Sequence, residues 1–101
     1  MRRIFYGMRA RCNYKKQQSY KHYGAKGIRV EWKNFNNFYE DMRLTYMRHT
    51  EKHGENDTSI DRIKKEGNYN KKNCRWATHS VQMKNRDYRE MLKKLERKVK
   101  K

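Results

Sequence analysis

Positive charge is the property that most restricts how this chain can fold. Lys and Arg number 28 and Asp and Glu number 11, so the formal net charge is +17 over 101 residues. Repulsion among so many like charges destabilises a compact chain unless a polyanion neutralises it. Solubility in a small domain needs a net charge of only about 2 to 8 and does not account for the excess. Nucleic acid is the commonest polyanionic partner, because release of its counterions gives affinity for any Lys/Arg-rich surface.

The charge is distributed unevenly along the chain. Residues 1–33 carry a net +9, residues 34–61 a net −3 and residues 62–101 a net +11. Two basic flanks around an acidic strip indicate a face for nucleic acid and a place where negative charge gathers. A membrane surface is the weaker candidate, because the apolar face of the C-terminal segment is narrow and lacks Trp and Phe. We therefore expect no membrane association.

Composition narrows the class of protein further. Apolar residues make up 34% of the chain, and no apolar run is long enough to span a bilayer. No charged-then-apolar leader with a small-residue cleavage site opens the sequence, which gives secretion no support. Cys12 and Cys74 are too few for a disulfide scaffold or a four-cysteine zinc site. We expect a small, reduced, cytoplasmic protein.

The N-terminal segment predicts a helix. Aromatic residues make up 13% of the chain and provide large side chains to bury, which argues against disorder. Ile4, Phe5, Met8 and Cys12 fall on one helical face and predict a helix over 4–12. A loop should follow over residues 13–18.

The next segment predicts a turn, a strand and a second helix. Gly24 and Gly27 indicate a turn that needs positive φ. Strict alternation of apolar and charged residues over 28–32 predicts a short, half-buried strand. Asn34 is a suitable N-cap, and a stripe of aromatic and Met side chains predicts a helix over 34–48. The polar residues after it predict a connector.

The second half of the chain predicts two strands and a third helix. Strands are expected over 58–63 and 73–77, with a turn-rich excursion over 64–72 between them. From about Thr78 the pattern becomes helical. Its apolar stripe covers under two heptads, which is too short for a coiled coil.

The expected architecture is therefore a single α+β domain over residues 1–101. It begins with a helix, a short strand and a helix, and continues with two strands and a long helix. We expect residues 58–86 to form the strand-strand-helix core of this domain. Residues 87–101 form a basic C-terminal helix.

The stretch from Ser59 to Thr78 carries a specific pattern. It runs Ser-Ile-Asp-Arg-Ile, then a Gly/Asn-rich excursion, then Asn-Cys-Arg-Trp and a helix. This pattern resembles the HNH, or ββα-metal, nucleases in the form found in phage proteins related to homing endonucleases. The likeness covers roughly residues 5–86. Other residues that resemble the phage subgroup are Tyr23-Gly24-Ala25-Lys26-Gly27-Ile28, Trp32, Gln82 and Asn85-Arg86.

The resemblance implies one divalent cation, Mg²⁺ or Mn²⁺, at the scissile phosphate, held by oxygen ligands. It puts Asp61 in the position of the metal-ligand carboxylate and Asn73 in that of an asparagine ligand or framework residue. Asn68 or Asn70 matches the asparagine that ties the excursion loop together. By residue type alone, Asp61 is also explained as a surface carboxylate paired with Arg62 or a nearby Lys.

The sequence departs from the family pattern immediately after Asp61. The family has the water-activating histidine there, whereas Arg62 stays protonated and cannot act as a general base. Three outcomes stay open. In the first, the water is activated by another residue, which is His79, Tyr69 or His22, with His79 preferred. In the second, Arg62 binds the phosphate and stabilises transition-state charge. In the third, the domain only binds DNA.

The resemblance thus predicts a phage or mobile-element endonuclease in the bacterial host cytoplasm, which cuts or nicks duplex DNA. Asp61 and Asn73 would hold the cation, and Arg62 and His79 are the catalytic candidates. The candidate nucleic-acid-binding residues are Arg29, Lys72, Arg75, Lys84 and Arg86.

Two rival hypotheses come from other classes. The first is a non-catalytic nucleic-acid-binding protein with a degenerate HNH fold. The second is an accessory protein that targets a host nucleic-acid enzyme through the acidic segment 34–61. None of these hypotheses fixes an oligomeric state.

Overall fold

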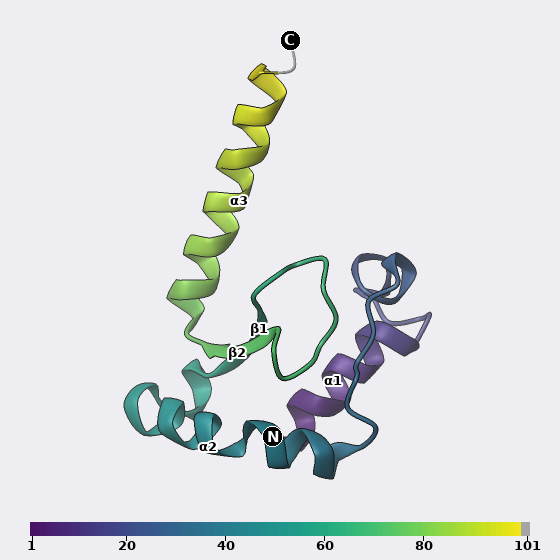
Figure 1. Ribbon diagram of the computed structural model, residues 1–101, viewed down its shortest axis with the longest axis vertical. Coiled ribbons are helices and arrows are strands. Elements are labelled where there is room, and N and C mark those ends of the chain that lie inside the picture. The colour runs from purple at the N-terminus through teal and green to yellow at the C-terminus, as the bar shows by residue number, and fades with distance from the viewer. Residues whose placement is uncertain (100–101) are drawn as a thin grey trace.

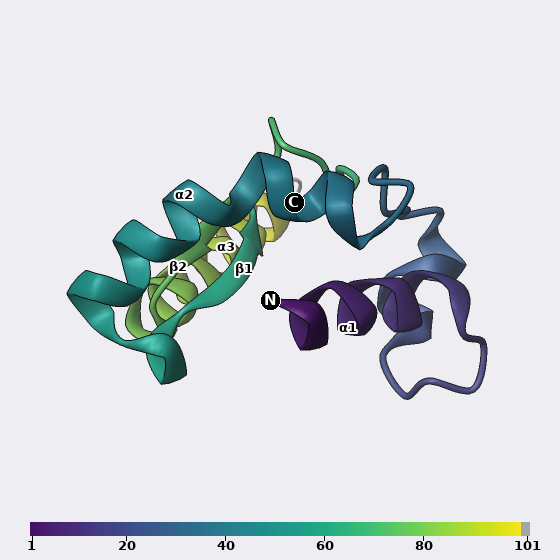
Figure 2. The ribbon, with the colours of Figure 1, turned by 90° about the horizontal axis from the view of Figure 1, so that it is seen from below.

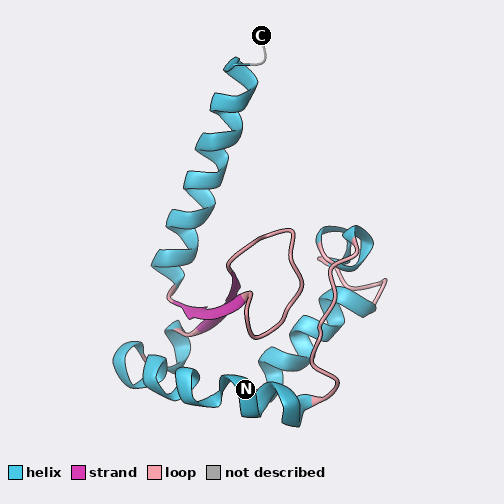
Figure 3. Ribbon diagram, viewed as in Figure 1, coloured by secondary structure: helices cyan, strands magenta, loops and turns pink. Residues whose placement is uncertain are grey.

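Three α-helices and one two-stranded antiparallel sheet make up most of the computed structural model, which describes residues 1–99 (Figures 1 and 3). The fold class is α+β, as the sequence predicts. Lys100 and Lys101, the end of the predicted basic helix, lie outside the described residues. The α-helices and strands are α1 (Arg2–Asn13), α2 (Phe35–His53), β1 (Ser59–Arg62), β2 (Cys74–Ala77) and α3 (His79–Val99). Short 3-10 turns are η1 (Tyr20–His22), η2 (Gly24–Lys26) and η3 (Glu55–Asp57).

The aromatic core joins α1 to α2. Phe5, Met8 and Cys12 are buried on one face of α1, which confirms the predicted helix and its apolar face. The centroid of the Phe5 ring lies 5.4 Å from that of Phe38 in α2, and the centroid of the Trp32 ring lies 4.9 Å from that of Phe38. Phe38 is fully buried at this junction. A cluster of large rings therefore holds the two helices together.

The second helix begins as predicted and ends later. The Asn34 side chain accepts a hydrogen bond from the backbone N–H of Asn37 at 2.9 Å, which confirms the N-cap. The helix continues to His53, beyond the predicted end at residue 48. Residues 49–53 are polar but contain no helix breaker. The helix ends only where Gly54 adopts φ +86°, so the prediction of a connector from residue 49 was wrong for this last turn.

The predicted strand over 28–32 does not form. Its alternation is real, since Ile28 and Trp32 are buried. Ladder pairing is confined to one parallel bridge between Val30 and Tyr69. A strand needs a partner that runs beside it for several residues, and the excursion loop does so at one point only.

The two glycines of the predicted turn have different roles. Gly27 has φ +84°, as expected, and ends η2. Gly24 does not have positive φ. It is instead required by close packing, because a Cβ there would lie 2.2 Å from the carbonyl oxygen of Cys12. The prediction of positive φ at Gly24 was wrong.

The hairpin and α3 follow the predicted order. Ile60 pairs with Trp76 and Asp61 with Arg75 in the antiparallel register. The Trp76 indole N–H donates to the carbonyl of Met42 at 3.2 Å, which fixes β2 against α2 (Figure 2). α3 then leaves the hairpin and extends away from the rest of the chain (Figure 1).

The start of α3 is anchored twice. The Thr78 hydroxyl accepts from the backbone N–H of Val81 at 3.2 Å, and Asp57 Oδ1 accepts from that of His79 at 2.9 Å. Both contacts satisfy N–H groups that lack partners in the first turn of a helix. Within residues 1–99, none of the helices combines the length and apolar character that crossing a membrane requires.

Candidate nucleic-acid interface

A cavity of about 330 Å³ lies where β1, the excursion loop and α3 meet. Four cationic side chains and one carboxylate line it, so its wall is strongly positive. Residues distant in sequence converge here from four segments. The lining residues are Tyr23, Ile60, Asp61, Arg62, Lys65, Tyr69, Gln82, Arg86 and Arg89.

A second cavity, of about 350 Å³, continues this surface along α3. It shares Lys65 with the first cavity and adds Lys26 from η2 and Lys93 from α3. Glu66 is its one acidic lining residue. We call the two cavities together the α3 groove, which is cationic along its length.

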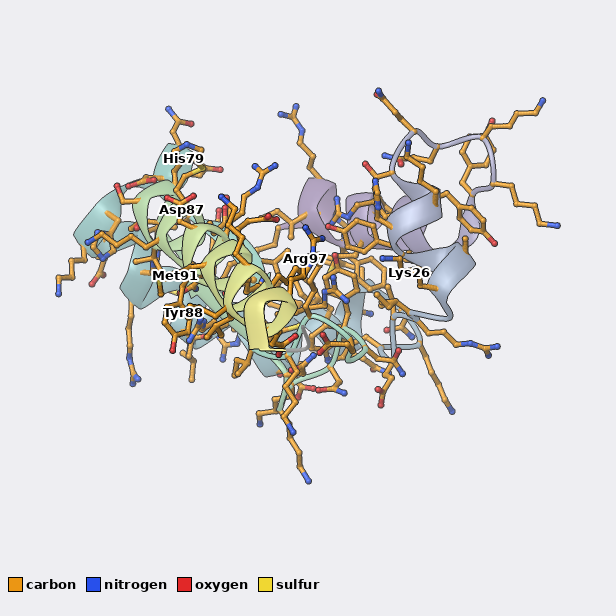
Figure 4. The ribbon with its side chains drawn as sticks, turned by 90° about the horizontal axis from the view of Figure 1, so that it is seen from above. Lys26, His79, Asp87, Tyr88, Met91 and Arg97 are labelled. Atoms are coloured by element: carbon orange, nitrogen blue, oxygen red, sulfur yellow. The ribbon has the colours of Figure 1, made fainter. Side chains whose placement is uncertain are left out.

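The two sides of α3 differ in character. Arg86, Arg89 and Lys93 line the α3 groove at spacings of three and four residues, which place them on one side of a helix. In Figure 4 Arg97 points toward the part of the molecule that carries Lys26, whereas Tyr88 lies on the other side of α3. The sequence spacing therefore puts a row of cations toward the groove and an apolar stripe away from it.

Arg62 is fixed by the excursion loop. Its Nη1 atom donates to the carbonyl of Lys65 at 2.6 Å and to that of Gly67 at 2.9 Å. Its guanidinium carbon lies 4.9 Å from the ring centroid of Tyr23 and 5.1 Å from that of Tyr69. These contacts make Arg62 a residue that closes the loop, with one edge of the guanidinium committed to carbonyl groups.

Tyr69 is poorly suited to act as a base. It is 3% exposed, and burial raises the pKa of its hydroxyl to about 12. The hydroxyl oxygen accepts from Nη2 of Arg11 at 3.2 Å and from its Nε at 3.3 Å. The neighbouring arginines oppose the rise in pKa without cancelling it. Near neutral pH the phenol therefore stays protonated.

Asp61 is paired across the hairpin. Its Oδ2 atom accepts from Nε of Arg75 at 3.0 Å, with the Asp61 side chain 13% exposed and the Arg75 side chain 46% exposed. The carboxylate thus has a cationic partner, as the surface-pair explanation required. That partner is Arg75 instead of the expected Arg62 or a nearby Lys.

Asn73 holds the base of the excursion loop. Its Oδ1 accepts from the backbone N–H of Lys64 at 2.8 Å, and its Nδ2 donates to the carbonyls of Lys64 at 3.1 Å and Asn68 at 2.9 Å. Asn70 Oδ1 in turn accepts a hydrogen bond from the backbone N–H of Asn73 at 2.7 Å. Asn73 is therefore placed as a framework residue, one of the two roles that the resemblance allows.

Asn68 and Asn70 both tie the loop to the segment before α2. Asn68 Oδ1 accepts from the backbone N–H of Arg29 at 2.9 Å, and Asn70 Nδ2 donates to Glu31 Oε2 at 2.8 Å. These contacts match the loop-tying role predicted for one of the two residues.

The residues present do not fit the implied cation site as they are arranged. Asp61 lines the α3 groove, whereas Asn73 does not. One oxygen of Asp61 is bonded to Arg75, and the side-chain oxygen of Asn73 is bonded to the loop backbone. Among residues 1–99 there is also no group of three or more His, Cys, Asp or Glu side chains arranged to hold a metal ion. As arranged, Asp61 Oδ2 and Asn73 Oδ1 are therefore both engaged in hydrogen bonds within the protein.

The candidate histidines lie in different places. His79 is exposed at the first turn of α3, and it is not among the residues that line the α3 groove. His22 lines the second cavity of the α3 groove, as Lys26 does. Neither histidine lines the part of the groove that Asp61 lines.

The predicted nucleic-acid-binding residues also lie in different places. Arg86 lines the α3 groove and Arg75 lies beside Asp61, whereas Arg29, Lys72 and Lys84 are exposed elsewhere. Four cations of the α3 groove were not among the residues predicted from the sequence.

These four cations are Lys26, Lys65, Arg89 and Lys93. The spacing of Arg89 and Lys93 from Arg86 on a predicted amphipathic helix is the signal that would have identified these two. Lys26 and Lys65 carry no such signal, because only the tertiary structure brings them to α3.

No protein-family model, curated protein or solved structure matches this chain.

Proposed function

We propose that this protein binds duplex DNA through the α3 groove. The observation that carries the proposal is the convergence of Arg62, Lys65, Arg86 and Arg89 around a cavity with one acidic lining residue. Cations held on one surface displace counterions from DNA and gain affinity for its phosphates regardless of base sequence. A net charge of +17 supports a polyanionic partner independently of the groove.

The shape of α3 supports the same partner. At 1.5 Å per residue, its 21 residues extend for about 31 Å. A projecting helix with cations along one side suits contact with a duplex, either along the phosphates or in the major groove. We expect such contacts to set position on the DNA and to give weak sequence preference.

The test compares cations on opposite sides of α3. Arg86→Ala and Arg89→Ala remove groove cations, and Lys84→Ala removes an equal charge from the same helix outside the groove. Binding to a labelled 20-base-pair duplex is measured by fluorescence anisotropy from 50 to 300 mM salt. Each groove variant should reduce the slope of log K against log salt by about 1, the effect of one lost phosphate contact. Lys84→Ala should change that slope little.

Equal effects of all three substitutions would show that net charge, not the groove, gives the affinity. Wild-type affinity in the Arg86→Ala, Arg89→Ala double variant would overturn the proposal. A matched RNA duplex identifies the preferred polyanion, and tighter binding of RNA would overturn the assignment to DNA.

An HNH-like endonuclease is our second proposal, and two observations favour it. The Asp61 carboxylate lies in the wall of the same cationic groove, as a carboxylate that acts on bound DNA must. The order β1, β2, α3 also agrees with the strand-strand-helix order of the resemblance. The arrangement of Asp61 and Asn73 gives no support to a bound cation, so we derive no metal-dependent step.

A supercoiled plasmid assay with Mg²⁺ or Mn²⁺ tests this second proposal. If the protein is a nuclease, wild type nicks the plasmid and Asp61→Ala does not, although both bind DNA. His79→Ala tests the substitute base, and Arg62→His restores the family's histidine. No nicking by wild type, together with DNA binding retained by Asp61→Ala, would remove the enzyme hypothesis and leave the binding function.

A further inference from the structure

A larger cavity, of about 490 Å³, lies between α2 and β2 and is not explained by the α3 groove. We call it the α2 cavity. Arg75 lines it, whereas Asp61, its ion-pair partner, lines the α3 groove. Small-molecule sites in proteins are concave, partly apolar and of about 300–1,000 Å³. The α2 cavity has this size, and its wall divides into an apolar floor and a cationic rim.

The floor consists of Met42, Cys74 and Trp76, all of them buried core residues. The polar atom of the indole is already satisfied, because Trp76 Nε1 donates to the Met42 carbonyl at 3.2 Å and to Thr45 Oγ1 at 3.1 Å. Burial raises the pKa of the Cys74 thiol to about 11, so the sulfur is uncharged near neutral pH. The floor therefore offers carbon and sulfur surface, which suits a flat ring and does not suit a bare inorganic ion.

The rim is cationic and comes from two segments. Arg48 and Lys52 lie one helical turn apart on α2, and Lys71 and Arg75 come from the end of the excursion loop and from β2. The one acidic lining residue is Asp41, whose Oδ2 already accepts from the Trp32 indole N–H at 2.8 Å. Four cations around an apolar floor favour a ligand that combines a ring with a negative group.

His49 adds a hydrogen-bond acceptor to this wall. The hydroxyl of Thr58 has one hydrogen, which it donates to the Gly54 carbonyl at 2.8 Å. The contact of 2.7 Å between His49 Nδ1 and Thr58 Oγ1 must then be donated by the histidine. Burial lowers the pKa of His49, which favours the neutral ring. In that neutral form Nε2 carries no proton, so a residue lining the cavity can accept a hydrogen bond from an amino group.

We propose that the α2 cavity binds a single nucleotide, with the base on the apolar floor and the phosphate among the rim cations. A purine or pyrimidine with an exocyclic amino group provides the flat ring and the donor that Met42, Trp76 and His49 fit. The nucleotide comes either from solution or from a DNA strand in which one base is unstacked. The site is separate from the α3 groove, so it does not depend on duplex binding there.

The first experiment titrates the full chain with dAMP, deoxyadenosine or inorganic phosphate and follows backbone amide NMR shifts. We expect saturable shifts over residues 41–53 and 71–76, with dAMP binding at least about tenfold more tightly than either fragment, because ring and phosphate contribute together. Arg48→Ala and Lys52→Ala should each weaken dAMP binding about tenfold. Both side chains are exposed, so the fold should tolerate their loss.

Arg43→Ala is the matched control, because Arg43 carries the same charge on α2 but does not line the α2 cavity. Its dAMP affinity should equal that of wild type. Affinity for dAMP no greater than for phosphate would overturn the proposal, as would shifts confined to Arg86 and Arg89. Neither result affects the duplex-binding proposal, which the Arg86→Ala and Arg89→Ala variants test.

A second arm identifies the source of the nucleotide. A duplex with one 2-aminopurine becomes brighter when that base leaves the stack. If the nucleotide belongs to DNA, wild type raises the fluorescence and the Arg48→Ala, Lys52→Ala double variant, while still bound to the duplex, does not. If dAMP binds but the fluorescence stays constant, the ligand is a free nucleotide.

Discussion

The carboxylate of Asp61 accepts a hydrogen bond of 3.0 Å from Nε of Arg75, the residue directly opposite it in the hairpin. Asp61 lines the α3 groove and Arg75 lines the α2 cavity, so this ion pair connects the two candidate binding surfaces. The pairing also occupies one oxygen of the carboxylate expected to hold a cation. The consequences of this arrangement can be measured.

The Asp61–Arg75 pair should affect DNA binding more than folding. Asp61→Asn should change the free energy of unfolding by less than about 1 kcal/mol, because the Arg75 side chain is 46% exposed and regains water. Removing the carboxylate from the groove should tighten duplex binding a few-fold at low salt, on the order of 0.5–1 kcal/mol. Urea unfolding and fluorescence anisotropy measure the two effects.

Asp87→Asn is the control for this substitution, because Asp87 is an exposed acid of α3 that does not line the groove. It should tighten binding less than Asp61→Asn. Weaker binding by Asp61→Asn would mean that the carboxylate positions Arg75 for DNA, contrary to our expectation.

Asn73→Asp separates a framework role from a metal-ligand role. An aspartate cannot donate to the carbonyls of Lys64 and Asn68 and would repel both, so we expect a loss of roughly 2–4 kcal/mol in the free energy of unfolding. A metal ligand would tolerate the change, since aspartate is the better ligand for Mg²⁺. Urea unfolding with and without 10 mM Mg²⁺ measures this, and a variant stabilised by Mg²⁺ above wild type would contradict the framework role.

Asn85 should be replaceable with a gain in stability. Its Nδ2 atom is buried in α3 and has no hydrogen-bond partner among the described residues. An unsatisfied buried donor costs about 1–3 kcal/mol, and an apolar side chain of similar shape avoids the cost. Asn85→Leu should therefore raise the free energy of unfolding by about 1 kcal/mol, measured by urea titration. A destabilised Asn85→Leu would show that the amide makes a contact in solution.

Alkaline pH should destabilise the protein through two buried acids. Burial raises the pKa of Cys74 from 9.0 to about 11 and that of Tyr69 from 10.0 to about 12. The folded state binds these protons more tightly than the unfolded state. For Cys74 the stabilisation is therefore complete below pH 9 and is lost as the pH rises from 9 to about 11. For Tyr69 it is complete below pH 10 and is lost as the pH rises from 10 to about 12.

Each shift corresponds to about 3 kcal/mol at most. Free energies of unfolding for wild type and Cys74→Ala, measured at pH 7, 9 and 10.5, isolate the thiol. Cys74→Ala should lose less stability than wild type between pH 9 and 10.5. Equal losses in the two proteins would assign the pH dependence to other groups.

Local sequence pattern predicted the main elements because they depend on contacts close in the chain. The Asn34 cap, the apolar face of α1 and the two strands of the hairpin could all be predicted from neighbouring residues. The end of α2 and the segment 28–32 could not. The first depends on whether polar residues stop a helix, and the second on whether a partner strand lies beside it.

The sequence by itself determined that this is a cationic chain with an aromatic core, a strand-strand-helix segment and an amphipathic last helix. These are properties of composition and of spacing over a few residues. Only the tertiary structure decided that Arg62 binds loop carbonyls, that Asp61 pairs with Arg75, and that Lys65 lines the same cavity as Arg86. It also brought Arg48 of α2 to Arg75 of β2 around one cavity. Such contacts join residues with no regular spacing, so the packing of the elements and the path of the excursion loop determine them.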